Sequence, residues 1–205
     1  EYATCGNGKV QSPIDIVNPM QTGNPNPVVA YTATQATVVN SGHDLDMVSP
    51  AGNKMTINGK TYEVEEAHLH TPAENLLNGK RFDAEIHAKQ VDADHKYSVF
   101  TVFVTTGAAN AAWQPFFDAA GVAVGASGEK ISINWAQLFP AAPKATIQFP
   151  GSLTTPPCTE GVSWIVDPQP ITMSQSQLDT LRAVYNNNDR PVQPLNGRPI
   201  TQDAK

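Results

Sequence analysis

The stretch Glu66-Ala67-His68-Leu69-His70 combines a strand pattern with residues that bind metal ions. Side chains alternate between faces along a strand, so His68 and His70 share one face and Leu69 is buried behind it. A third histidine ends the string Glu85-Ile86-His87. Three neutral imidazoles without a fourth protein ligand leave one coordination position for water, as catalytic zinc sites require. The two strings therefore predict β-structure that carries a zinc-hydroxide site.

Two glutamates accompany these histidines. Glu66 shares the face of His68, and Glu85 shares the face of His87. A carboxylate bound to one ring nitrogen fixes the tautomer of a ligating histidine. The alternative is an ordinary strand with surface carboxylates, because an isolated His-X-His pair is weak evidence for a metal. The third histidine, with a glutamate of its own, strengthens the metal interpretation, and the rest of the chain has to decide it.

Length and composition limit the classes of protein. With 205 residues and 40% hydrophobic residues, the chain can bury one sizeable core, and we expect one domain over residues 1–205. The net charge of −6 and the absence of a basic run exclude nucleic acid and anionic membranes as partners. No apolar stretch approaches the roughly 18 residues of a membrane helix. The chain begins at Glu1, as a processed secreted protein or a trimmed chain would.

The two cysteines bear on the compartment. Cys5 lies in the N-terminal arm, and Cys158 follows the Pro156-Pro157 pair. They remain open to interpretation as two unrelated buried thiols of a cytosolic enzyme. A bridge between them would close a very long loop and stabilise the fold accordingly. We favour the disulfide and hence a periplasmic or secreted protein.

Short β-type runs dominate the rest of the chain, and Asn58-Gly59 and Asn78-Gly79 are strong turn signals. Residues 98–104 are apolar on both faces, which is typical of a central strand covered on both sides. Helices are few. The expected strands lie in residues 37–39, 55–57, 84–88, 97–104 and 162–166, and the expected helices in 174–185, with Ser174 as N-cap, and 113–120.

Several segments resemble the α-class carbonic anhydrases, in the order in which that family has them, and the string His70-Thr71-Pro72-Ala73-Glu74 is similar to the bacterial branch. The resemblance covers almost the whole chain, and its most specific piece is Gly-Ser-Leu-Thr-Thr-Pro-Pro. The segments are residues 11–16, 41–43, 68–70, 85–87, 151–157 and 190–195.

The resemblance implies a mainly β, single-domain fold around a large, twisted, mostly antiparallel central sheet with a few short helices. It implies that His68, His70 and His87 bind Zn²⁺, whose water is acidified toward neutrality and attacks carbon dioxide to give bicarbonate and a proton. The enzyme would be a carbonate dehydratase, a zinc lyase. Carbon dioxide and bicarbonate would be its partners, sulfonamides and anions its inhibitors, and a homodimer is left open.

The family also implies roles for single residues. Thr154 would accept the proton of the hydroxide in a hydrogen bond and donate its own to Glu74, which is a positioning effect. His43 would carry the released proton to buffer. Without the family, Thr154 is an ordinary turn hydroxyl and His43 a surface turn residue. Glu66 and Glu85 would support the zinc ligands from behind, and Cys5 and Cys158 fall where extracellular members have a bridge.

The carbon dioxide pocket is implied in the same way, although its members would otherwise be taken for core residues. Lys89 departs from the family, which usually has valine there. A lysine at this position narrows the pocket or attracts anions, unless its flexible stem carries the ammonium outward. The implied pocket comprises Val99, Leu153, Thr155, Val162, Trp164 and Lys89.

Other departures concern proton chemistry. Glu66 stands where the family usually has an amide, and a carboxylate there makes the imidazole a stronger donor to zinc, which raises the pKa of the zinc-bound water. Ser41 and Asp46 replace two asparagines near His43, so that proton transfer is slowed or the pKa of His43 is raised.

Two alternative functions remain. A binding protein that keeps the fold without the activity usually lacks a zinc histidine, whereas this chain has all three. A zinc esterase or other hydrolase would use the same hydroxide, but the chain has no His-Glu-X-X-His helix of a peptidase.

Overall fold

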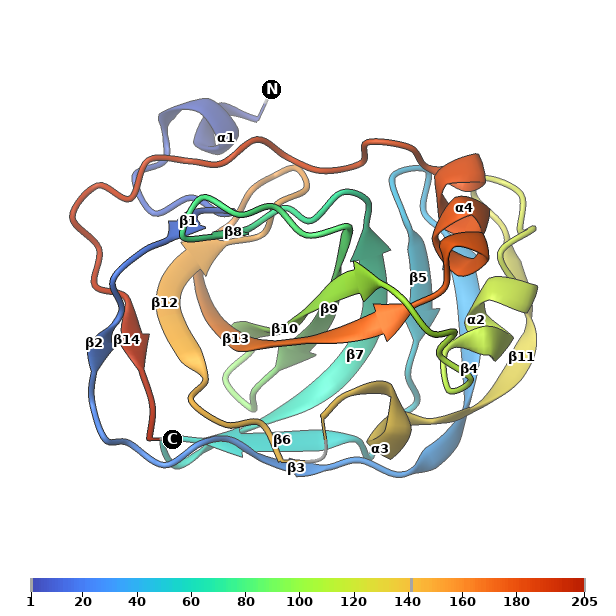
Figure 1. Ribbon diagram of the computed structural model, residues 1–205, viewed down its shortest axis with the longest axis horizontal. Coiled ribbons are helices and arrows are strands. Elements are labelled where there is room, and N and C mark those ends of the chain that lie inside the picture. Colours follow the sequence, from blue (N-terminus) through green and yellow to red (C-terminus); the bar gives the residue numbers. More distant parts are fainter. Residues whose placement is uncertain (1, 141, 205) are drawn as a thin grey trace.

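The computed structural model describes residues 2–140 and 142–204, so positions 1, 141 and 205 of the predicted domain lie outside the described residues. A 12-stranded mixed sheet forms most of the molecule, and the helices are short (Figure 1). The predicted mainly β fold with a large, mostly antiparallel sheet is confirmed. Each of the five predicted strand runs lies within a strand.

The large sheet has one long path with a short side branch. Along the path, only the pairs β10–β13 and β14–β2 are parallel. Its order is β11 (Ser127–Asn134), β4 (Ala33–Asn40), β5 (Leu45–Val48), β7 (Lys60–His70), β9 (Ala84–Val91), β10 (Tyr97–Thr106), β13 (Glu160–Met173), β12 (Ile147–Ser152), β14 (Thr201–Gln202) and β2 (Met20–Gln21). In the branch, β6 (Lys54–Ile57) pairs with β7 and with β3 (Val28–Ala30), and β1 (Asp15–Ile16) pairs with β8 (Leu76–Leu77) apart from this sheet.

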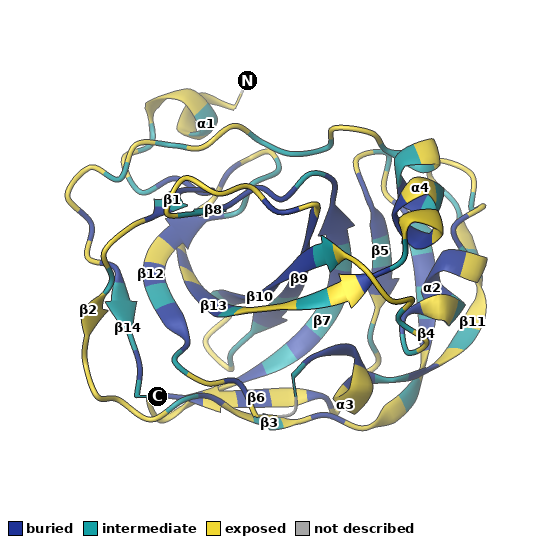
Figure 2. Ribbon diagram, viewed as in Figure 1, coloured by how far each residue is buried: buried dark blue, intermediate teal, exposed yellow. Residues whose placement is uncertain are grey.

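The sheet is central because its middle strands are covered on both faces. Val99 and Phe103 of β10 belong to one buried cluster, whereas Phe100, Val102 and Val104 belong to another. This division follows the alternation of side chains along a strand. Figure 2 shows β9 and β10 as mostly buried. The prediction of a doubly covered strand at residues 98–104 is therefore confirmed.

The described residues form four short helices around the sheet: α1 (Ala3–Asn7), α2 (Gln114–Asp118), α3 (Trp135–Leu138) and α4 (Gln175–Val184). In α4 the Ser174 side chain accepts from Gln177 N, and the Gln177 side chain accepts from Ser174 N, a capping box that satisfies two backbone donors. The predicted N-cap is confirmed. After α4 the chain runs past α1 to β14, along the top of Figure 1. No described helix is long and apolar enough to cross a bilayer.

A β-bulge lies in β7 just before the histidines. Val64 is opposite Gln90 of β9, and Glu66 is opposite Lys89, so Glu65 is an extra residue in β7. The bulge changes the phase of the strand. Val64 and Ala67 are therefore both buried in the core, although they are three residues apart.

The turns between strands have the geometry that their sequences indicate. Asn58 and Gly59 have φ angles of 50° and 76°, and Asn78 and Gly79 have φ angles of 51° and 75°. Two successive residues with positive φ match the right-handed twist of a hairpin, and Asn-Gly accommodates them at little cost. The two turn predictions are confirmed.

Candidate metal centre

The three histidines meet where β7 and β9 pair. His68 is directly opposite His87 in the antiparallel register, and His70 lies two residues farther along β7. The ring centroids of the three pairs are 4.7 to 5.2 Å apart, and one nitrogen from each ring lies within 4.8 Å of the others. Leu69 is fully buried behind them, as alternation predicts. The strand geometry thus produces a cluster of three imidazoles.

Hydrogen bonds fix two of these rings through their Nδ1 atoms. Nδ1 of His68 lies 2.8 Å from Oε2 of Glu66, and Nδ1 of His70 lies 2.9 Å from the backbone oxygen of Asn188. A carbonyl only accepts, so His70 carries its proton on Nδ1 and presents a lone pair on Nε2. That Nε2 is buried and has no hydrogen-bond partner among the described residues. A buried, unpartnered imidazole lone pair fits a metal ligand.

The third ring faces Glu85, although its buried Nε2 makes no hydrogen bond among the described residues. Nε2 of His87 lies 3.3 Å from Oε1 of Glu85, which leaves Nδ1 of His87 for a ligand. Asn75 holds this carboxylate through its backbone N–H to Oε2 and its Nδ2 to Oε1, both at 2.7 Å. Ile14 N donates to Oδ1 of Asn75 at 2.9 Å and so fixes which way the amide faces. The sequence did not point to Asn75.

The surroundings set the charge of the rings. Burial, together with the charge of His70, lowers the pKa of His87 well below its usual value, so this ring is held neutral. Burial also opposes protonation of His68, but the charge and hydrogen bond of Glu66, with Asp44 and Asp46, raise its pKa to about 10. Neutral imidazole is the form that binds metal. The acidic groups around His68 favour a positive charge at this ring, whether a proton or a metal ion.

One side of the site is acidic. Oδ1 of Asp46 lies 3.7 Å from Nδ1 of His68. Burial raises the pKa of Asp46 to about 7, with further contributions from the charges of Glu66 and Asp44. The hydroxyl of Ser41 donates to Asp44 and accepts from the backbone N–H of Asp44 at 3.1 Å. Asp44 is therefore part of the site, although the sequence did not identify it.

Glu74 lies beside the histidines with one oxygen bound and one free. Its Oε1 accepts the backbone N–H of Arg190 at 2.7 Å. Its Oε2 is buried, lies 3.6 Å from Nε2 of His70, and has no hydrogen-bond partner in the part of the chain that the structure describes. Thr154 and Glu74 line the same hollow of about 410 Å³. Their hydrogen bond stays a prediction.

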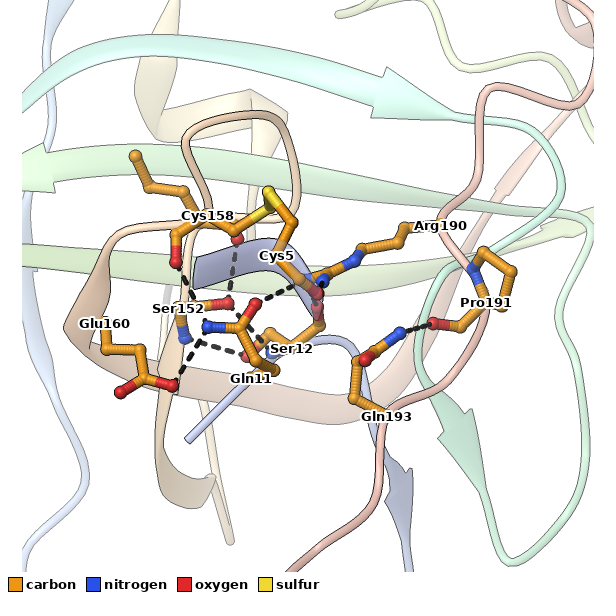
Figure 3. Close-up of a disulfide and its surroundings, with 10 residues drawn as sticks. Cys5, Gln11, Ser12, Ser152, Cys158, Glu160, Arg190, Pro191 and Gln193 are labelled. Carbon is orange, nitrogen blue, oxygen red and sulfur yellow. Dashed lines mark hydrogen bonds between the residues drawn. A yellow bond between two sulfur atoms is a disulfide. The ribbon is translucent and has the colours of Figure 1, made fainter. Parts of the chain in front are cut away.

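A disulfide joins Cys5 of α1 to Cys158, as we expected (Figure 3). The backbone N–H of Cys158 donates to the carbonyl of Thr155 at 2.9 Å, so the bridge is attached to the turn that follows Thr154. The Arg190 guanidinium donates to the carbonyl of Cys5 at 2.8 Å. It also donates to Oε1 of Gln11 at 2.9 Å and to the carbonyl of Ser12 at 2.6 Å. Arg190 thus connects Glu74 to the disulfide.

His68 and His87 line a cleft of about 250 Å³, whereas His70 lines the hollow beside Glu74. Five of the six residues expected in the carbon dioxide pocket line it, whereas Val162 is buried in the adjoining core cluster and does not line it. His43 is exposed and borders both this cleft and the hollow beside Glu74. The lining residues among those predicted are Val99, Leu153, Thr154, Thr155, Trp164, Lys89, His43, Glu66, His68 and His87.

The lysine on this wall is held at its end. Nζ of Lys89 lies 3.0 Å from Oε2 of Glu65 and 4.8 Å from the centroid of the Tyr97 ring. Burial alone would lower the pKa of Lys89, but the hydrogen bond and charge of Glu65 raise it overall. Lys89 lines the cleft, and its ammonium contacts two residues that do not line it. Of the two outcomes expected for this lysine, the structure has the outward one.

Comparisons with known proteins agree with this site. A family model described as eukaryotic-type carbonic anhydrase matches residues 1–204. A carbonic anhydrase from Neisseria gonorrhoeae is 36% identical over 209 residues, which cover 98% of this chain and 81% of the relative. The α-carbonic anhydrase of Photobacterium profundum superposes with a TM-score of 0.92 at 36% identity, covering 98% and 93% of the two chains. The enzyme from Thermovibrio ammonificans, solved with the inhibitor sulfanilamide, has a TM-score of 0.90 at 33% identity and coverages of 98% and 90%.

Proposed function

Because this chain belongs to the eukaryotic-type, or α, carbonic anhydrase family of lyases, we propose that its histidine cluster is a zinc centre for the reversible hydration of carbon dioxide. His68, His70 and His87 would hold the metal, through Nε2 of His68, Nε2 of His70 and Nδ1 of His87. Zinc in such a site supplies a water that ionises near neutral pH, the nucleophile that carbon dioxide requires. The observation that carries the proposal is the buried, unpartnered Nε2 of His70 within a cluster of three imidazoles.

The protein positions the nucleophile through Glu74, which is held by Arg190. Its backbone N–H occupies Oε1 of Glu74, so Oε2 is the oxygen that remains to accept a hydrogen bond. The hydroxyl of Thr154 donates to that oxygen in the proposed mechanism. A hydroxyl that has donated its proton can only accept from the nucleophile, and this directs the lone pair of the nucleophile at carbon dioxide.

The cleft provides the place for the substrate and the route for the proton. Val99, Leu153 and Trp164 give one side of it apolar character, which suits a small uncharged molecule such as carbon dioxide. His43 is exposed at its border and takes the proton that the reaction releases. From this exposed border it can pass the proton on to buffer. We propose that Asp44 and Asp46, which also line the cleft, influence the rate of this transfer.

The disulfide agrees with a periplasmic or secreted enzyme, which is where such bridges persist. Sulfonamides are expected to inhibit it, as sulfanilamide is described as an inhibitor of the Thermovibrio ammonificans relative. Monovalent anions are expected to inhibit it as well.

Stopped-flow measurement of carbon dioxide hydration on zinc-quantified protein tests the proposal. We expect a rate above the uncatalysed reaction that disappears on metal removal, returns with zinc and is suppressed by a sulfonamide. His70→Ala should abolish metal binding, and the exposed turn variant His95→Ala is the control, because it removes a histidine outside the site. Protein with stoichiometric zinc and no catalysed rate would favour a binding protein that has kept the fold.

A further inference from the structure

Lys89 is the lysine among the described residues that line the cleft, and its positive charge is opposite to that of Asp44, Asp46 and Glu66 in the same lining. It is opposite Val99 of β10 and two residues past His87 on β9. The ammonium is bound by Glu65 and lies over the Tyr97 ring, and neither of these residues lines the cleft. The ammonium of Lys89 is therefore held by two residues at the rim of the cleft, outside its lining.

The β-bulge accounts for the availability of Glu65. A regular pairing places one residue of β7 opposite Lys89, whereas the bulge places Glu65 and Glu66 there. The two carboxylates then have separate partners: Glu66 binds His68 at 2.8 Å, and Glu65 binds Lys89 at 3.0 Å. The ion pair of Glu65 with Lys89 therefore does not compete with the hydrogen bond between Glu66 and His68.

We propose that Glu65 and Tyr97 hold the Lys89 ammonium at the rim of the cleft and thereby set the affinity of the metal centre for small anions, bicarbonate and monovalent inhibitors among them. The inference rests on the proposed function, because these anions would compete for the metal. Lysine has four rotatable bonds in its stem, so an ammonium released from both partners can turn into the cleft. A cation inside a partly enclosed cleft attracts anions more strongly than one already paired in solvent.

Inhibition by thiocyanate at constant ionic strength is the measurement. We use an inhibitor and not bicarbonate as the probe. The equilibrium constant of the reaction fixes the ratio of kcat/KM for hydration to kcat/KM for dehydration, so one of these values cannot change without the other. Tyr97→Leu removes the ring without changing any charge, and Glu65→Gln removes the carboxylate. Each should lower the inhibition constant by about threefold to tenfold at low salt, less at high salt. Tyr97→Phe keeps the ring and should match the wild type.

A double-mutant cycle separates movement of the lysine from simple loss of a negative charge. Glu65→Gln makes the cleft less negative even if the ammonium stays in place. In a Lys89→Met background, both Glu65→Gln and Tyr97→Leu should therefore lose most of their effect. Glu129→Gln removes a carboxylate from an exposed position on β11 and serves as the control for net charge.

A second readout does not depend on turnover. Thiocyanate binding can be followed by the visible spectrum of protein loaded with cobalt(II), and the dissociation constants should change in the same order as the inhibition constants. Equal effects of Glu65→Gln in both backgrounds, or no effect of Tyr97→Leu, would overturn the proposal for Lys89. A wild type with bound zinc and no hydration would instead overturn the proposed function, and the spectral titration would still report on Lys89.

Discussion

The backbone N–H of Arg190 donates a 2.7 Å hydrogen bond to Oε1 of Glu74, whose Oε2 is buried and has no hydrogen-bond partner among the described residues. A carboxylate can accept at both oxygens, whereas an amide has a single acceptor oxygen. The relationship therefore leaves Oε2 of Glu74 as the oxygen that the proposed hydrogen bond from Thr154 would use.

Glu74→Gln is expected to lower kcat/KM for carbon dioxide hydration by about a hundredfold. The N–H of Arg190 would keep the amide oxygen, so the NH₂ group would face Thr154 and could not accept its proton. Stopped-flow rates on zinc-quantified protein check this, with Glu129→Gln as the exposed control. An unchanged kcat/KM would remove Glu74 from the proposed mechanism.

Glu66→Gln is expected to move the midpoint of the pH–rate profile to lower pH. Oε2 of Glu66 lies 2.8 Å from Nδ1 of His68, and a carboxylate acceptor makes that imidazole a stronger electron donor than an amide acceptor does. A weaker donor leaves zinc a stronger Lewis acid. Profiles of kcat/KM against pH for both proteins test this, and superimposable profiles would refute it.

Alternation of side chains was enough to predict the shared face of His68 and His70 and the burial of Leu69. It could not reveal the extra residue Glu65, because a bulge is decided by pairing with another strand and not by the composition of its own. For the same reason, the sequence could not show that Lys89 pairs with Glu65.

Residues 190–195 stood out by their resemblance to the family, but the backbone contacts of Asn188 and Arg190 with the site could not be predicted, for a different reason. Asn188 accepts from His70 through its backbone carbonyl, and Arg190 donates to Glu74 through its backbone N–H. Nearly every residue has these two groups, so their position in the fold alone gives them a role. Asp44 and Asn75 do act through side chains, but only the folded chain brings them to His68 and Glu85.

His43→Ala is expected to lower kcat on the order of tenfold or more in weak buffer and to leave kcat/KM nearly unchanged. His43 is exposed and lines the border of the cleft, where it can exchange protons with solvent. Added imidazole should restore the rate in the variant and have little effect on the wild type. If imidazole gives no rescue, proton transfer takes another path.

Replacing both cysteines, Cys5→Ser with Cys158→Ser, is expected to lower the free energy of unfolding by about 2–5 kcal/mol. The bridge closes a loop across 153 residues and connects α1 to the turn after Thr155. Denaturant melts of the wild type with and without reductant, compared with the double variant, give the size of the effect. The variant should be insensitive to reductant, and a wild type equally stable in both conditions would contradict the prediction.

Asp167→Asn is expected to stabilise the fold at neutral pH. Asp167 lies in β13 with 1% of its surface exposed, and burial raises its pKa, against one opposing hydrogen bond from Gln169 N. The folded state therefore holds this proton to higher pH than the unfolded state, whose pKa is near 3.8. The free-energy cost of ionising the buried carboxyl group is absent below the unfolded-state pKa. It grows as the pH rises from there toward the folded-state pKa.

The stabilisation by Asp167→Asn should consequently shrink as the pH is lowered from 8 toward 4, because both proteins are then neutral at this position. Melting temperatures of the two proteins across this range measure the difference, and metal loss at low pH affects both alike. Asn keeps the Oδ1 that accepts from Gln169, so the turn itself is preserved. The exposed variant Asp94→Asn should show no such pH dependence. A stabilisation that is constant with pH would show that the burial of charge at Asp167 is not its cause.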